Sequence, residues 1–180
     1  TDDALYTRNG DRLQFQIRGA QAGILSDVSF LQGRLYGKLI HPIGPRSRGL
    51  ARLELGAMST GEFRSLPPSL RFFAGGANSV RGYSYNSLGP RDEADHVIGG
   101  PYLVTASLEA DHIFFMDRYG LAVFADAGNA LNSLSLNLKK GVGVGFRWIS
   151  PVGLVRADLG WGLDRKGTPL NVHLAIGSEL

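Results

Sequence analysis

The sequence predicts an all-β fold, an antiparallel segment of a transmembrane β-barrel with about eight strands. Three observations lead to this prediction. Apolar and polar residues alternate with a period of two along most of the 180 residues, which is typical of strands whose two faces meet different surroundings. The alternating segments are about ten residues long, the length that a tilted strand needs to cross a bilayer. Short and long connections also alternate, as they do in outer-membrane barrels.

The strands are expected over residues 11–20, 28–40, 49–59, 101–113, 118–127, 140–149, 153–162 and 170–180. The first three follow from the period of two that runs through the chain. In the fourth, "VTASLEA" alternates strictly and places Glu109 opposite Val104 and Leu108. In the fifth, Asp126 shares a face with Phe124 and lies opposite the apolar face.

The last three strands alternate most clearly, and glycines, charged residues and His173 lie opposite their apolar faces. Those apolar faces carry Val142, Val144, Phe146 and Trp148 in the sixth strand, Val155, Ala157, Leu159 and Trp161 in the seventh, and Val172, Leu174 and Ile176 in the eighth.

The composition excludes several classes of protein. Cysteine is absent, so neither a disulfide scaffold nor a thiolate metal site is expected. A net charge of +3 without a dense basic run gives little support to nucleic-acid binding. No apolar stretch approaches the roughly 18 residues of a transmembrane helix, and "TDDALYTRNG" lacks the features of a signal peptide. We therefore expect a mature protein or a piece of a longer one.

The two tryptophans bear on which face meets lipid, because periodicity alone does not separate a barrel from a soluble sandwich. Trp148 ends a strand beside a short turn, and Trp161 ends the next strand beside a longer loop. In a barrel they would form a membrane girdle at opposite interfaces, whereas in a sandwich they would be core residues. In the barrel, Arg at Leu174 is expected to block assembly and Arg at Asn171 to be tolerated.

The connection over residues 60–100 is far longer than an ordinary hairpin loop, so it is either functional or disordered. Its central part, "FFAGGANSVRGYSYNSLGP" (72–90), is rich in glycine and carries Phe72, Phe73, Tyr83 and Tyr85. Disordered segments usually carry charge and few aromatic residues. We therefore expect an ordered loop that packs against the rest of the protein.

The motif "VRGY" (Val80, Arg81, Gly82, Tyr83), followed by "SLEAD" on one strand and "FADAG" (124–128) on the next, resembles the Omp85 superfamily of outer-membrane barrels. "GVGVGFRWISPVG" and the ending "HLAIGSEL" resemble its TamA branch, the translocation and assembly module. The resemblance implies a sixteen-stranded barrel preceded by POTRA domains, of which residues 1–180 would be strands nine to sixteen, the C-terminal half. Many outer-membrane strands end in an aromatic residue. The last strand of this sequence instead ends in Leu180, and TamA-like barrels resemble it there.

The resemblance also implies roles for particular residues. It places the VRGY loop inside the barrel, with Arg81 paired to Asp126 and with Glu109 nearby; the alternation independently points both acids inward. The alternative is that Asp126 starts a turn and that Arg81 is solvated. A weak seam between the first and last strands would open for client strands, which gives the eighth strand, with Val172, Leu174, Ile176 and Leu180, a functional role.

No enzymatic site is expected. "GVGVG" (141–145) lacks the spacing of a nucleotide-binding loop. The four histidines have no metal-ligand spacing, and no nucleophile elbow is present. The acidic cluster of Asp92, Glu93 and Asp95 fits a solvated loop tip better than a cation site. We accordingly expect neither a cofactor nor a metal.

Two functions are therefore considered first, both in the bacterial outer membrane. One is an assembly, insertion or translocation factor whose partners are membrane lipid, client β-barrel or autotransporter proteins and a TamB-like inner-membrane-anchored protein. The other is a secretion pore of a two-partner or patatin-type autotransporter system. A soluble β-sandwich enzyme is a third alternative.

The loop's size adds a constraint. An eight-stranded barrel has an interior just wide enough for side chains, so a loop of this length does not fit inside one. We expect the strands to belong to a wider barrel. The chain alone should either expel a poorly ordered loop or form a homodimer that shares one barrel.

Overall fold

The computed structural model describes residues 6–23, 28–151, 153–165, 167 and 169–177. It has eight strands, close to the ranges predicted from the sequence, which confirms the all-β prediction. They are β1 Gly10–Ala20, β2 Phe30–Gly44, β3 Ser47–Thr60, β4 Tyr102–Phe115, β5 Tyr119–Leu131, β6 Lys139–Ser150, β7 Gly153–Gly162 and β8 Leu170–Gly177. Leu180 lies outside the described residues.

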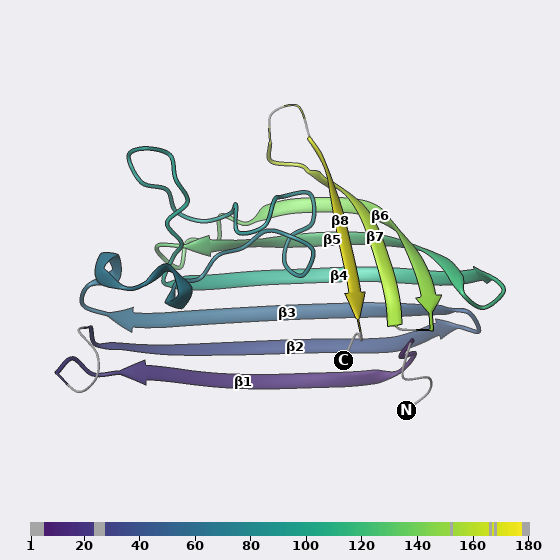
Figure 1. Ribbon diagram of the computed structural model, residues 1–180, viewed down its shortest axis with the longest axis horizontal. Coiled ribbons are helices and arrows are strands. Elements are labelled where there is room, and N and C mark those ends of the chain that lie inside the picture. The colour runs from purple at the N-terminus through teal and green to yellow at the C-terminus, as the bar shows by residue number, and fades with distance from the viewer. Residues whose placement is uncertain (1–5, 24–27, 152, 166, 168, 178–180) are drawn as a thin grey trace.

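All eight strands form one sheet in chain order, and every neighbouring pair is antiparallel. Figure 1 shows that the sheet is strongly curled, with β6 to β8 turned over toward the loops that lie above β4. Within the described residues, β1 pairs only with β2 and β8 only with β7. The fold is thus an open, curled sheet, and the alternative of two packed sheets in a soluble sandwich is wrong.

The two faces of the sheet differ in the way that a barrel in a membrane requires. The convex outer face exposes large apolar side chains, among them Leu13 (75% exposed) and Leu174 (73%). The concave inner face buries charged groups, including Asp126 and Arg147. An apolar face of this extent is unfavourable in water, whereas it matches the hydrocarbon core of a bilayer.

The connection between β3 and β4 lies against the concave face. It begins with two 3-10 turns, Phe63–Ser65 and Pro68–Leu70. Its apolar side chains then form a core with the inner faces of β3, β4 and β5; the fully or nearly fully buried members are Met58, Leu66, Phe72, Ala74, Val80, Tyr83, Leu88, Leu103 and Ala130. Among the described residues, no helix is long and apolar enough to span a membrane.

The loop is therefore ordered and packed, which confirms the expectation from its aromatic residues. Of the two outcomes expected for the chain alone, the expelled loop is wrong, and the homodimer that shares one barrel stays a prediction. The sheet stays open, so its concave side has room that a closed eight-stranded barrel would not have. The eight strands do not close into a small barrel, and the open sheet holds the loop on its inner face.

Candidate functional site

The inner faces of β4 to β7 bring a set of charged side chains together beneath the loop. Strand alternation points every second residue inward, which places Glu109 on β4, Asp126 on β5, Arg147 on β6 and Asp158 on β7 toward the concave side. β5 continues through Asp126 to Leu131, so the alternative in which this aspartate starts a turn is wrong.

Arg81 and Gly82 of the VRGY motif form the inner tip of the loop, called the loop tip below. The Arg81 side chain contacts Asp126 in a bidentate arrangement. Its Nε lies 2.8 Å from Asp126 Oδ2 and its Nη2 lies 3.0 Å from Oδ1. The backbone N–H of Arg81 donates to the same carboxylate, at 2.9 Å. Paired, charge-assisted bonds of this kind are strong and fix orientation. One carboxylate therefore holds both the side chain and the backbone of the loop tip.

The remaining donors of Arg81 are also satisfied. Nη1 donates to Glu109 and lies 3.3 Å from Asp158 Oδ2, and Nη2 lies 3.2 Å from Ser107 Oγ. The guanidinium carbon is 3.5 Å from the centre of the Phe124 ring, a cation–π geometry. The structure thus brings Arg81 into contact with both acids that the family resemblance pairs with it, and the alternative of a solvated arginine is wrong.

Burial of Arg81 by itself would lower the pKa of its guanidinium. The hydrogen bonds and negative charges of Asp126 and Glu109 outweigh that effect, so its pKa lies above the ordinary value. The side chain is consequently charged at neutral pH. An ion of this kind is stable in a shielded site only while its partners remain.

Two further arginines, which the sequence reasoning did not include, extend this cluster toward the short-turn end of the strands. Arg147 forms two ion pairs: its Nη2 lies 2.6 Å from Glu109 Oε1, and its Nη1 lies 2.6 Å from Asp158 Oδ1. Arg48 on β3 binds Asp111 at 2.7 Å. The signal that could have identified them is their position in the alternation, because each lies on the face opposite the apolar residues of its strand.

The loop comes close to β7 and β8 at Gly82. Its φ is +93°, and a Cβ there would lie 2.6 Å from the carbonyl carbon of Trp161. Its N–H donates to His173 Nε2 at 3.2 Å, and its carbonyl accepts from Asn171 Nδ2 at 2.7 Å. Only glycine fits both the conformation and the space. Because Asn171 holds the loop, the expectation that Arg is tolerated there does not fit the structure.

The other members of the VRGY motif pack in the core. Val80 is fully buried and Tyr83 is 3% exposed. The Tyr83 hydroxyl accepts from the backbone N–H of Asp164 at 3.2 Å and lies 3.3 Å from the carbonyl oxygen of Lys140. The motif is thus tied to the connections at the long-loop end as well as to the strands.

The proposed girdle and seam residues lie on the outer face. Trp148 is 39% exposed and Trp161 is half-buried. They lie near opposite ends of the β6–β7 pair, since Trp148 is opposite Val155 and Trp161 is opposite Val142. The outward residues of β8 are among the most exposed in the structure: Val172, Leu174 and Ile176.

Comparison with known proteins agrees with this architecture. The model of the Omp85 superfamily domain matches residues 1–179. The chain is 39% identical over 132 residues to outer membrane protein assembly factor BamA of Nitratidesulfovibrio vulgaris, a match that covers 69% of this chain and 16% of that protein. It is 30% identical over 142 residues to sorting and assembly machinery component 50 homolog A of Xenopus laevis, covering 75% of this chain and 25% of that protein.

A SAM50-like protein of Schizosaccharomyces pombe is 28% identical over 142 residues, with 76% of this chain and 30% of that protein covered. The chain thus spans less than a third of the length of these relatives. Among solved structures, BamA from Haemophilus ducreyi lacking POTRA domains 1–3 superposes with a TM-score of 0.75 at 16% identity, over 97% of this chain and 38% of that one. That likeness shows the shared fold.

The family match covers nearly the whole chain, and the sheet has the apolar outer face and the inner loop that a barrel of this kind requires. The chain belongs to the Omp85 superfamily and is part of a β-barrel of the bacterial outer membrane.

Proposed function

We propose that this chain is the C-terminal half of a barrel that inserts or translocates outer-membrane proteins, without making or breaking covalent bonds. The observation that carries the proposal is the loop over residues 61–101, whose tip is held by a buried arginine and three carboxylates. The relatives named as assembly factors support the same function. Its clients would be other β-barrel proteins or autotransporters.

The edges of the sheet suggest how a client would be received. β8 pairs with β7 on one side only, among the described residues. A strand edge of this kind offers unpaired N–H and C=O groups to another strand. In the complete barrel, β8 would form a weak seam with the first strand, and the outward Val172, Leu174 and Ile176 would keep that seam in lipid.

The anchored loop gives the barrel wall a fixed inner support next to that edge. Gly82 bonds to Asn171 and His173, both on β8. The loop therefore holds β8 at its inner face while its outer edge is free to pair. We propose that this support keeps β8 ordered during exchange of strand partners, and that Trp148 and Trp161 act as the girdle that fixes depth.

A finer assignment rests on motifs alone. The "GVGVGFRWISPVG" segment and the C-terminal residues favour a TamA-like factor with a TamB-like partner anchored in the inner membrane. The relatives reported above are of the BamA and SAM50 kind. Pull-down of the full-length protein with inner-membrane proteins would separate the two assignments.

Reconstitution tests the proposed function directly. The full-length protein, placed in phosphatidylethanolamine and phosphatidylglycerol liposomes, should speed the folding of a urea-unfolded outer-membrane barrel, followed by the heat-dependent shift of that barrel on a gel. Empty liposomes are the control. Unchanged folding, together with passage of a secreted passenger into the liposomes, would instead favour the secretion pore.

A further inference from the structure

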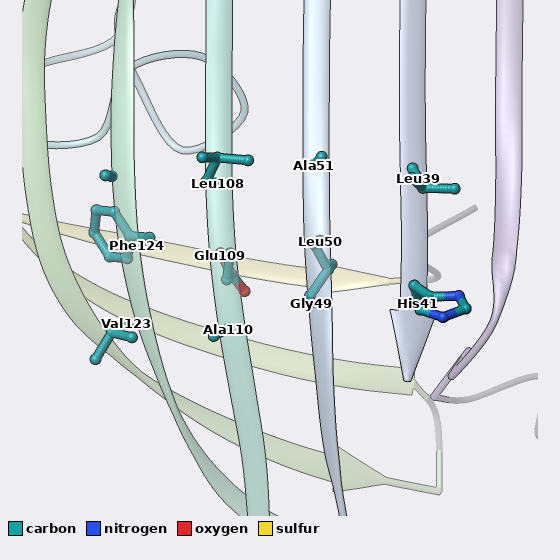
Figure 2. A pocket seen from close by; sticks show the side chains of 11 residues that line it. Leu39, His41, Gly49, Leu50, Ala51, Leu108, Glu109, Ala110, Val123 and Phe124 are labelled. Carbon is teal, nitrogen blue, oxygen red and sulfur yellow. The ribbon is translucent and has the colours of Figure 1, made fainter. Parts of the chain in front are cut away.

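A groove on the outer face lies over β2 to β5. Its lining includes Glu109 and Phe124, which contact Arg81 on the inner side, whereas its outward-facing residues take no part in holding the loop. Figure 2 shows residues that line it on successive strands: Leu39 and His41 on β2, Gly49 and Ala51 on β3, and Leu108 and Ala110 on β4. Apart from His41, these residues are leucine, alanine or glycine. All six belong to the outward set of the alternation, so the groove opens toward the membrane rather than toward the loop.

Small residues set side by side produce the groove. Gly49 lies between His41 and Ala110 in register, and Ala51 lies between Leu39 and Leu108. The small residues Gly49 and Ala51 therefore form the bottom of the groove. Its sides are formed by the projecting side chains of Leu39 (53% exposed) and Leu108 (66% exposed). The hollow therefore follows β3, between the apolar side chains of β2 and β4.

Glycine at position 49 is not required by the fold. A Cβ on Gly49 would find its nearest heavy atom, in Ile43, at 3.6 Å, which is ordinary van der Waals contact. A Cβ on Gly82, in contrast, would come within 2.6 Å of the backbone of β7. Gly82, within the loop, is needed for close packing against β7, whereas Gly49 on the outer face leaves the groove open.

The short turns that close these strands carry positive charge. Arg46 lies in the β2–β3 turn and Arg118 in the β4–β5 turn, and both are exposed. The side chain of Arg8 binds the carbonyl oxygen of Gly44 beside the first turn, at 3.0 Å. Asp117, 3.3 Å from Arg46, offsets one of these charges. The end of the groove thus meets an excess of guanidinium groups where lipid headgroups would lie.

We propose that the groove binds an acyl chain of an anionic phospholipid whose phosphate lies against Arg46 and Arg118. Gly49 is the third residue after Arg46, a rise of roughly 10 Å along an extended strand. The hydrocarbon half of a bilayer is about 15 Å thick. The groove therefore receives the part of the chain nearest the headgroup, and the charges at the turns select an anionic one.

Native mass spectrometry of the full-length protein tests this proposal, with dioleoyl phosphatidylglycerol and dioleoyl phosphatidylethanolamine as the probes. The wild-type protein should retain phosphatidylglycerol preferentially. Gly49→Leu with Ala110→Leu should lower retention of both lipids roughly tenfold, because the new side chains fill the groove and remove the packing contacts of the acyl chain. Gly33→Leu is the matched control, because Gly33 is an outer-face glycine of β2 with nothing within 4 Å of its Cβ position.

The charges are tested separately by Arg46→Gln with Arg118→Gln, two exposed positions that should not affect folding. This variant should lose the preference for phosphatidylglycerol and keep its binding of phosphatidylethanolamine. Equal lipid retention by the wild-type, filled-groove and Gly33→Leu proteins would overturn the proposal. So would a protein dimer that disappears when the groove is filled, because the groove would then hold a second copy of the chain.

Discussion

Replacing Arg81 with alanine is expected to release the loop and to destabilise the barrel by about 3–5 kcal/mol, the cost of breaking a buried ion pair. Among the ion pairs of the described residues, the substitution leaves Asp126 without an arginine, whereas Glu109 and Asp158 keep Arg147. The lower stability should appear in the unfolding of the full-length protein in detergent. The concentration of guanidinium chloride at the unfolding midpoint should be lower than for the wild-type protein.

A double-mutant cycle distinguishes the pair from a general loss of packing. Asp126→Ala alone should also be costly, since it removes the bidentate partner of the Arg81 guanidinium and the acceptor of the Arg81 backbone N–H. The double variant should lose clearly less free energy of unfolding than the two single variants lose together. The difference, which is the coupling energy of the pair, should be roughly 1–3 kcal/mol. Additive losses would show that the two residues do not act as partners. Arg91→Ala, on an exposed part of the same loop, is the control for removal of an arginine.

Arginine at Leu174 is expected to cost about 2–4 kcal/mol if the side chain lies near the midplane of the bilayer, and to prevent stable assembly. Leu174 is 73% exposed on the outer face of β8, opposite Ala157 on β7. The charge would therefore enter lipid with no partner. Heat-modifiability on a gel should show a loss of the folded, membrane-inserted form.

The matched control places a charge on the other face of the same strand. Ala175 lies on the inward side of β8, opposite Arg156 in register. Ala175→Glu should therefore assemble normally, because its carboxylate would face an arginine in a polar interior. If Leu174→Arg and Ala175→Glu assemble equally well, the outer face does not meet lipid.

The period of two was enough to predict every strand and the inward direction of Asp126 and Glu109. Alternation determines the face of a residue once the strand is recognised, so the polar interior followed from sequence. The exact ends of the strands did not follow from the sequence. "FADAG" has the composition of a turn, although β5 continues to Leu131. Pairing with β4 overrides that local tendency.

The contacts across the loop were harder to predict. The resemblance paired Arg81 with Asp126, whereas Arg48 and Arg147 were missed because nothing in a single sequence shows which inward charges meet in space. Asn171 was misjudged for the same reason. It looked like a neutral inward position, and only the folded loop shows that its amide binds the carbonyl of Gly82.

Hydrogen exchange at the loop tip, in the full-length protein embedded in lipid, tests the central claim most directly. The amides of Arg81 and Gly82 donate to Asp126 and His173 on the strands, so an anchored loop should protect both for hours. Gly82→Ala should remove this protection, and Gly33→Ala should leave it intact. Rapid exchange of these two amides in the unmodified protein would contradict the account, because the loop would not be held against the barrel wall.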